Sequence, residues 1–353
     1  MVNGLIFGET LEIALGNCKP IGLGTAAFGG VYGGGLEQDE ADAIVAEALA
    51  AGITHFDTAP FYAAEQSSEA VLGKALAASG VPRSSYTVAS KVCRGRDANG
   101  QSTHETTAEA MAASLATSAA ALGGPLDVVL VHDIEFLDYA TLVDEVLPRL
   151  RTWRDDGSSP AISPATRIGV AGYPLDTLAR ATRDASPDAV QAYATATLLD
   201  ARLESDAPGS VRGAIGECLV APHLFHASVT GMGLLTPQGP QPWHPLHGQP
   251  RHYAAVSDAV AAAVEALAAA DLPSLPDVAL YRSLAAHHAG VGTTLLGPAS
   301  LAQLRSMLAV VDAVASGSAA IAPLDAGLAL VEGIISEHLA PLDAPPVFWP
   351  SGL

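Results

Sequence analysis

Strand-like and helix-like segments alternate along this sequence, and no other feature constrains its fold as strongly. Short apolar runs are predicted as strands, and segments with helical periodicity or helix-end signals separate consecutive runs. The eight predicted strands are 21–25, 53–56, 86–90, 127–131, 167–171, 189–193, 224–229 and 293–296. Because this alternation requires a parallel sheet and eight such units can close on themselves, we expect an α/β fold, a (β/α)8 barrel.

The predicted helices fill the intervals between these strands. They are 39–51, 67–78, 106–122, 139–153, 175–185, 210–218, 254–270 and 277–289. An open doubly wound sheet is the alternative, and it usually carries a G-x-G-x-x-G turn after its first strand. Here Gly22 and Gly24 lie within the first predicted strand, so that fingerprint fails. Since α/β barrels reach about this length as one unit, we expect a single domain over residues 1–353.

Four segments fall outside the regular alternation. Residues 1–17 are predicted as a short N-terminal β-hairpin around a Gly-Glu-Thr turn. Residues 155–166 are predicted as a flexible insert before the fifth strand. The Pro-rich segment 236–253 follows the seventh strand, on the face where barrel enzymes keep their active sites. Residues 341–353 are expected to pack over a surface without extending the barrel.

The charge of the chain disfavours nucleic acid and anionic membranes as partners. With 17 Lys and Arg against 37 Asp and Glu, the net charge of −20 repels phosphate, although it also serves solubility. Three widely spaced cysteines, Cys18, Cys93 and Cys218, fit a reducing compartment. The first residues lack the basic start and apolar segment of a signal peptide, and helix 254–270 contains charged residues. We therefore expect a cytoplasmic protein without a membrane partner.

Polar residues follow three consecutive predicted strands. Asp57 comes directly after the second strand, Lys91 after the third and His132 after the fourth, and Tyr62 stands in the loop beside Asp57. In a parallel barrel these side chains meet at one rim. An ammonium lowers the pKa of a nearby phenol, a carboxylate keeps that ammonium charged, and an imidazole can hydrogen-bond the same substrate oxygen. The set predicts proton transfer coupled to hydride transfer at a carbonyl or hydroxyl carbon.

Each of these residues alone has a simpler structural explanation. Asp57 could cap a helix, Lys91 could be a solvated lysine at the rim, and His132 could be a structural histidine. Their joint placement after consecutive strands favours the catalytic hypothesis. The histidines at 223, 226, 244, 247, 252, 287 and 288 suggest a zinc hydrolase as another alternative. No acidic or cysteine ligand stands at a suitable spacing around them, so no metal site is predicted.

The order Gly24-Thr25, Asp57, Tyr62, Lys91, His132 resembles the aldo-keto reductase family, and the resemblance covers nearly the whole chain. Further motifs resemble one branch of that family, the D-arabinose 1-dehydrogenases of fungi and the L-galactose dehydrogenases of plants. These motifs are VHDIEF at 131–136, AGYPLD at 171–176, GMGLLTPQGPQPWHP at 231–245 and FWPSG at 348–352. The segment 190–203 is more similar to the fungal enzymes.

The resemblance implies a nicotinamide cofactor in extended form across the barrel mouth. The cofactor contacts that it implies are Gly24, Thr25, Asp57, Gln191, Ser228, Met232, Leu234, Gly297, Ser300 and Gln303. Tyr62, His132 and Trp243 would contact the substrate. The sequence departs from the family at Ala227, where many members stack a tyrosine on the nicotinamide, and at Met307, where an asparagine often meets adenine.

The segment after the last predicted strand bears on the choice between NAD and NADP. Gly297-Pro-Ala-Ser300 starts a helix, and the free N–H groups there attract phosphate. Ala299 and Ser300 are uncharged where NADPH-binding members carry Arg or Lys, and Arg305 lies one helical turn further on. Because a 2′-phosphate needs a basic partner, NAD is the expected cofactor and NADP the less favoured one.

These expectations combine into one functional hypothesis. The chain is expected to be an NAD-dependent aldose 1-dehydrogenase that oxidises C1 of a cyclic aldose of the D-arabinose, L-galactose or L-fucose type to the aldonolactone. By resemblance, its product would lead to ascorbate or the five-carbon analogue, and the protein would be a monomer or weak homodimer. One alternative is an NADPH-dependent aldehyde or ketone reductase of the same family. The other is a non-catalytic scaffold that binds the cofactor.

Overall fold

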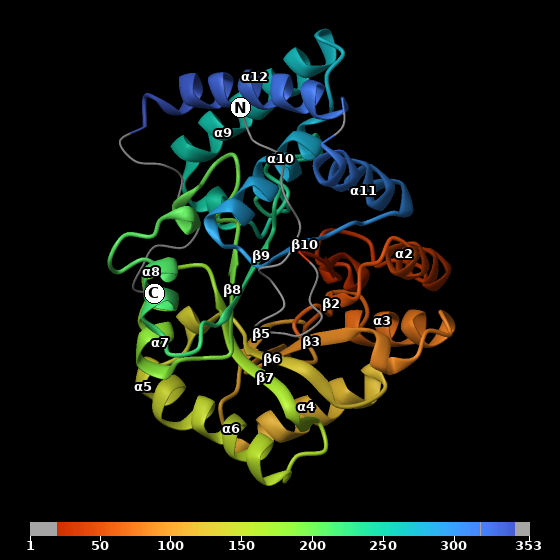
Figure 1. Ribbon diagram of the computed structural model, residues 1–353, viewed down its shortest axis with the longest axis vertical. Helices are drawn as coiled ribbons and strands as arrows, with labels where there is room; N and C mark the ends of the chain where they lie inside the picture. Colours follow the sequence, from red (N-terminus) through yellow and green to blue (C-terminus); the bar gives the residue numbers. More distant parts are fainter. Residues whose placement is uncertain (1–19, 318, 343–353) are drawn as a thin grey trace.

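A closed parallel barrel forms the centre of the computed structural model, which describes residues 20–317 and 319–342 (Figure 1). Eight strands are hydrogen-bonded in the order β1-β10-β9-β8-β7-β6-β3-β2, and β2 returns to β1. The strands are β1 (Ile21–Gly24), β2 (His55–Asp57), β3 (Thr87–Val92), β6 (Leu126–Val131), β7 (Ile162–Gly172), β8 (Ala189–Tyr193), β9 (His223–Ala227) and β10 (Thr293–Leu296). The predicted (β/α)8 barrel is confirmed.

Helices surround the barrel and connect its strands (Figure 1). They are α2 (Gln38–Ala50), α3 (Ser68–Ala78), α4 (Ala108–Leu122), α5 (Tyr139–Thr141), α6 (Leu147–Asp156), α7 (Leu175–Ala185), α8 (Val211–Glu217), α9 (Pro250–Ala269), α10 (Leu275–Leu284), α11 (Leu301–Ser316) and α12 (Ile321–Leu339). Side-chain oxygens of Ser67, Thr107, Ser210 and Ser274 accept backbone N–H groups at the starts of α3, α4, α8 and α10. These caps fix where the helices begin.

Alanines and a few larger apolar side chains fill the interior of the barrel. Ala89, Ala171 and Ala189 face Leu130 and Phe225 in one buried cluster. At residue 169 on β7, a Cβ atom would come within 2.2 Å of the Ala189 carbonyl oxygen, so only glycine permits this strand approach. The larger apolar core lies between the strands and the surrounding helices. The barrel is therefore a rigid frame for the side chains at its rim.

A second apolar layer joins α9 to α12, the pair of helices at the top of Figure 1. Val256, Ala259, Ala263 and Leu267 recur at helical spacing along α9 and lie in one cluster with residues of α12. This last helix was not predicted from the sequence. No single helix in the described part of the chain is long and apolar enough to cross a membrane, although α11 and α12 pass that test as a pair bent by 109°.

Two local predictions need correction, and one element was missed. The insert at 155–166 is shorter than expected because β7 already begins at Ile162. Within β7, the Thr166 hydroxyl donates to the Leu126 carbonyl of the neighbouring strand at 2.6 Å. The helix at 139–153 is interrupted by a π-helical turn, Leu142–Val146. A two-stranded antiparallel hairpin, β4 (Arg94–Arg96) and β5 (Ser102–His104), follows β3 and was not predicted. The N-terminal hairpin and nearly all of the Pro-rich tail lie outside the described residues.

Candidate active site

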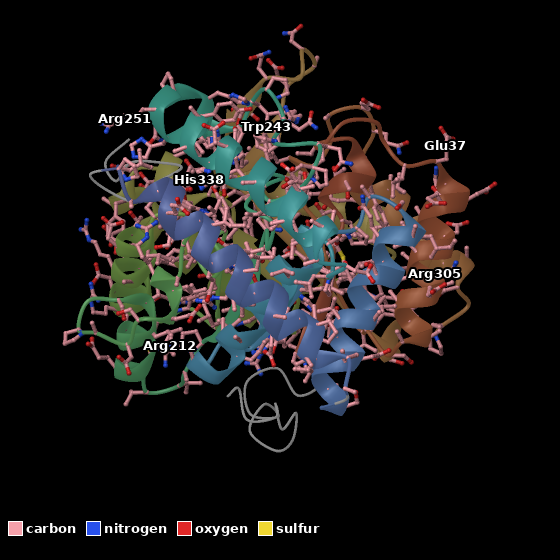
Figure 2. The ribbon with its side chains drawn as sticks, turned by 90° about the horizontal axis from the view of Figure 1, so that it is seen from above. Glu37, Arg212, Trp243, Arg251, Arg305 and His338 are labelled. Atoms are coloured by element: carbon pink, nitrogen blue, oxygen red, sulfur yellow. The ribbon has the colours of Figure 1, made fainter. Side chains whose placement is uncertain are left out.

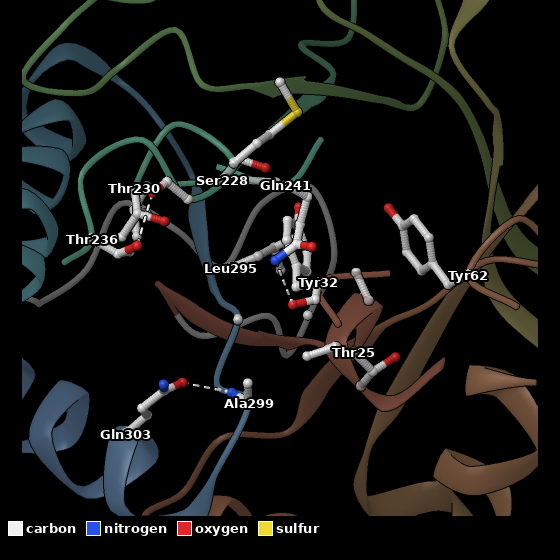
Figure 3. Close-up of a pocket in the computed structure, with 18 of the residues that line it drawn as sticks. Thr25, Tyr32, Tyr62, Ser228, Thr230, Thr236, Gln241, Leu295, Ala299 and Gln303 are labelled. Carbon is white, nitrogen blue, oxygen red and sulfur yellow. Dashed lines mark hydrogen bonds between the residues drawn. The ribbon is translucent and has the colours of Figure 1, made fainter. Parts of the chain in front are cut away.

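Two adjoining cavities open at the carboxyl ends of the barrel strands. The first, of about 260 Å³, is lined by the end of β1, the loop after β9 and the start of α11 (Figure 3). The second, of about 280 Å³, is lined by β3, the β4–β5 hairpin and the ends of β6 to β8. The residues that line both are Tyr32, Tyr62, Ala227, Ser228 and Met232. A ligand in one cavity therefore contacts the boundary of the other.

Lys91 and Asp57 form a buried ion pair below this boundary. Asp57 is the last residue of β2, and Lys91 is the fifth residue of β3. The Lys91 Nζ donates to Asp57 Oδ1 at 2.7 Å and to the Thr58 carbonyl at 2.9 Å. Burial raises the pKa of Asp57 and lowers the pKa of Lys91, and the charge of each partner opposes the shift of the other. Each charge therefore favours the ionised form of its partner, against the effect of burial.

Tyr62 and His132 lie above this pair. The Lys91 Nζ is 4.9 Å from the centroid of the Tyr62 ring, and the edge of the His132 ring meets that phenol ring at a centroid distance of 5.6 Å. Burial, the Lys91 charge and the Arg94 charge hold the pKa of His132 well below its usual value. The imidazole is therefore neutral, and its Nδ1 has no hydrogen-bond partner among the described residues.

The phenol of Tyr62 differs from the sequence-based expectation. Lys91 was expected to lower its pKa, but burial and then the Asp57 carboxylate raise it well above the ordinary value. The cation that opposes this rise is Arg94. The Lys91 ammonium donates to Asp57 and Thr58, and among the described residues no hydrogen bond joins it to the phenol oxygen. Tyr62 is therefore a neutral phenol, able to donate a hydrogen bond to a substrate oxygen.

Seven of the ten residues implied as cofactor contacts line the first cavity. They are Gly24, Thr25, Asp57, Ser228, Met232, Gly297 and Gln303. Gln191 lines the second cavity instead, and its buried Oε1 has no hydrogen-bond partner in the described chain. Such an acceptor fits the amide N–H of a nicotinamide carboxamide. The long cavity, which runs from α11 to Tyr62, together with this open acceptor, fits an extended dinucleotide.

Two implied cofactor contacts lie elsewhere. Neither Leu234 nor Ser300 lines either of the two cavities described above. Leu234 is 2% exposed and belongs to the apolar layer with α9. The Ser300 hydroxyl accepts the Gln303 N–H at 3.2 Å and caps α11, while Gln303 Oε1 accepts the Ala299 N–H at 2.7 Å (Figure 3). The side chains of Leu234 and Ser300 therefore have structural roles.

The predicted substrate contact Trp243 lines the second cavity, and its indole N–H donates to the Val31 carbonyl at 3.0 Å. Sequence reasoning missed most of the other residues of this cavity. They include Tyr32, Phe61, Arg94, Arg96, Asp133 and Tyr193. The two arginines stand in Arg-Gly-Arg directly after the strand that carries Lys91, and this alternation is the signal that could have identified them.

Comparison with known proteins agrees with this geometry. The model of the aldo/keto reductase family matches residues 20–322. The L-galactose dehydrogenase of Arabidopsis thaliana is 30% identical over 349 residues, which cover 96% of this chain and 97% of that protein. The D-threo-aldose 1-dehydrogenase of a Pseudomonas species is 30% identical over 255 residues, covering 66% of this chain and 72% of that protein.

Solved structures share the fold at lower identity. The glycerol dehydrogenase of Gluconobacter oxydans superimposes with a TM-score of 0.65 at 20% identity, covering 94% of this chain and 95% of that one. An aldo-keto reductase of Bacillus halodurans in its holo form gives a TM-score of 0.61 at 17% identity, covering 90% and 92%. The family model spans most of the chain and the Arabidopsis relative spans nearly all of it. The chain therefore belongs to the aldo-keto reductase family, whose members bind a nicotinamide cofactor.

Proposed function

We propose that this protein is an NAD-dependent aldose 1-dehydrogenase, which oxidises the C1 hydroxyl of a cyclic aldose to the aldonolactone. The observation that carries the proposal is the arrangement of Asp57, Lys91, Tyr62 and His132 where two cavities adjoin. One cavity suits a dinucleotide and the other a small polar molecule. Two relatives at 30% identity are named as sugar dehydrogenases, which supports a sugar as the substrate.

Tyr62 and His132 supply the proton chemistry in this proposal. The sugar oxygen at C1 lies within reach of the phenol oxygen and the neutral imidazole, and Tyr62 takes up the hydroxyl proton as phenolate or through a shared proton. The bound nicotinamide supplies the hydride acceptor. Lys91 and Asp57 hold a fixed dipole beneath the phenol, and burial of Asp57, Lys91 and His132 limits the access of water to the reacting atoms.

The surroundings of α11 support NAD over NADP. The Arg305 guanidinium donates to both carboxylate oxygens of Glu47 on α2, at 2.7 and 2.8 Å, where α11 lies beside α2 (Figure 2). Glu40 accepts the Leu301 N–H at 2.7 Å, so a carboxylate already occupies the start of α11. A 2′-phosphate there would meet Glu40 while the nearest arginine is paired with Glu47.

The second cavity supports a substrate of single-sugar size. Its volume of about 280 Å³ is near the lower end of ligand pockets, roughly 300–1,000 Å³. Phe61 and Trp243 offer apolar faces, while Arg94, Asp133 and Tyr193 offer hydrogen-bonding groups. D-arabinose, L-galactose and L-fucose share ring stereochemistry at C2 to C4, so one cavity of this kind suits all three. A cytoplasmic location and a monomer or weak homodimer complete the proposal.

A panel of aldoses with NAD and with NADP tests the proposed function. We expect NAD reduction with D-arabinose, L-galactose and L-fucose, measured at the nicotinamide absorbance, and near-complete loss of turnover in Tyr62→Phe. Turnover of simple aldehydes with NADPH alone would establish a reductase instead. Cofactor binding without turnover of any sugar or aldehyde, unchanged in Tyr62→Phe, would establish a scaffold protein.

A further inference from the structure

The β4–β5 hairpin presents two arginines to the second cavity. Arg94 and Arg96 are two residues apart on β4, so their side chains leave the strand on the same face. Both guanidinium groups lie over the Phe61 ring, with the Cζ atoms 3.8 Å and 4.2 Å from its centroid. Phe61 directly precedes Tyr62 in the sequence, which places both arginines beside the proposed reaction site.

The cations that line this cavity differ in their pairing. Lys91 is paired with Asp57, and Arg94 is paired with Asp133. Arg96 is the remaining cation of the lining, and within residues 20–317 and 319–342 it forms no ion pair. The Glu135 carboxylate, which is not part of the lining, acts on Arg94 and accepts a hydrogen bond from Tyr193, so it is not a direct partner of Arg96. The lack of an ion pair for Arg96 among the described residues is notable in a chain with a net charge of −20, where acidic partners are abundant.

The Arg96 guanidinium is also held in a fixed orientation. Its Nε donates to the Phe61 carbonyl at 3.0 Å, and its Nη1 donates to the Gly100 carbonyl at 2.8 Å. The Phe61 ring packs against its planar face. Nη2 keeps its donors for a ligand, and an oriented guanidinium of this kind suits a carboxylate. Arg96 does not line the first cavity, so the cofactor phosphates are not the anion that this geometry suits.

We propose that the second cavity accepts uronic acids, which are aldoses that carry a carboxylate at the carbon farthest from C1. In this proposal Arg96 binds that carboxylate. The inference rests on the proposed function, because the reaction is the same. A bound NAD would accept the C1 hydride, Tyr62 would take the C1 hydroxyl proton, and C1 would become the lactone carbonyl. The carboxylate is unchanged, and Arg96 is a specificity-determining residue that contacts it.

Turnover of two sugars that differ only at C6 tests the proposal. For L-galacturonate, Arg96→Gln should lower kcat/KM by about 30-fold or more, the effect of removing one partner of a charged contact. For L-galactose the loss should be at least about tenfold smaller, because only the uronate loses a charged contact, and Arg96→Lys should restore part of the uronate activity. Arg180→Gln is the matched control, since Arg180 also stacks on an aromatic ring, Tyr139, but lies on α7. Equal losses for both sugars would overturn the proposal.

Binding measured without turnover separates this proposal from the proposed function. A methyl uronoside has its C1 oxygen blocked, so titration calorimetry with the NAD-loaded protein measures binding alone. We expect it to bind more tightly than the neutral methyl glycoside, and Arg96→Gln should abolish the difference. Failure of every aldose to react would defeat the proposed function. Equal binding of the two glycosides to the wild-type protein would instead overturn the carboxylate site.

Discussion

Two polar clusters are buried in this barrel, one at each end, and they differ in charge. At the carboxyl ends of the strands, Lys91 and Asp57 form an ion pair whose side chains are 1% and 4% exposed. At the amino ends, the His55 ring on β2 and the His223 ring on β9 both pack against the Phe225 ring. Their centroids are 4.9 Å and 4.5 Å from the centroid of that ring. His55 hydrogen-bonds to Thr87 and His223 to Thr293.

A partner charge opposes the effect of burial in only one of these two clusters. Burial lowers the pKa of His55 to about 3 and that of His223 to about 4, so both histidines are neutral and hydrogen-bonded to threonine hydroxyls. At the carboxyl ends, Lys91 and Asp57 lie 2.7 Å apart, and the charge of each opposes the effect of burial on the pKa of the other. A buried ion pair contributes little net stability compared with apolar residues of equal volume. Its presence at the rim is therefore better explained by chemistry than by folding.

The largest predicted effect comes from removing one charge of the Lys91–Asp57 pair. Lys91→Met should lower turnover roughly 100- to 1,000-fold and the free energy of unfolding by about 3–5 kcal/mol, because Asp57 is left buried without its partner. Denaturant unfolding and steady-state kinetics measure both effects. The double variant Asp57→Asn with Lys91→Met should recover much of the stability and none of the activity. Recovery of activity would show that the ion pair serves only folding.

The buried pair of His55 and His223 should make the stability of the protein sensitive to acid. Both histidines have pKa values below the unfolded value of about 6.5, so their contribution to stability is present above that pH and is lost as pH falls. At pH 5 each histidine should reduce the free energy of unfolding by about 2 kcal/mol relative to neutral pH. Denaturant unfolding across this range measures the slope, and His223→Asn should flatten it. An unchanged slope in that variant would contradict the assignment.

The pH dependence of sugar oxidation tests the role of Tyr62, which lies above the Lys91–Asp57 pair. Since burial and Asp57 raise the pKa of Tyr62, the phenolate that accepts the substrate proton becomes more populated as pH rises. The rate of sugar oxidation should increase by up to about tenfold per pH unit on the alkaline side of neutrality. Lactone reduction, which uses the neutral phenol, should lack this rise. The same increase in both directions would point to a different titrating group.

The smallest predicted effect concerns a third pair, which lies at the surface. Glu47→Gln releases Arg305, which then becomes available to a 2′-phosphate. The ratio of NADP to NAD activity should rise by about two- to fivefold, within the range of an exposed pair. Glu337→Gln on α12 removes the same charge at an exposed position and should leave the ratio unchanged. Equal effects of the two variants would show that the change in net charge, and not the release of Arg305, alters the cofactor ratio.

The fold and the rim residues could be predicted because both follow from strand positions. Asp57 ends β2, Lys91 is the last residue but one of β3 and His132 directly follows β6, and in a parallel barrel all carboxyl ends share one face. The β4–β5 hairpin could not be predicted in the same way. Its strands have three residues each and are polar, which leaves no periodic apolar pattern, so Arg94 and Arg96 were missed.

Properties that depend on side-chain direction could also not be predicted. Whether Lys91 lowers the pKa of Tyr62 depends on where the ammonium points, and it points at Asp57 and Thr58. Leu234 faces an apolar layer that includes α12, a helix the sequence reading lacked, so its burial could not be anticipated. Ser300 marks the start of α11 as expected, but its hydroxyl is used for that cap.

The position of Trp243 gives this protein an internal optical probe. Its indole is 45% exposed, faces the second cavity and is held by one backbone carbonyl. A sugar that displaces water from this ring will shift the ultraviolet emission of the ring toward shorter wavelength. The chain has only three tryptophans, so replacing the other two with phenylalanine leaves a single emitter that reports occupancy in real time, with no dye and no turnover.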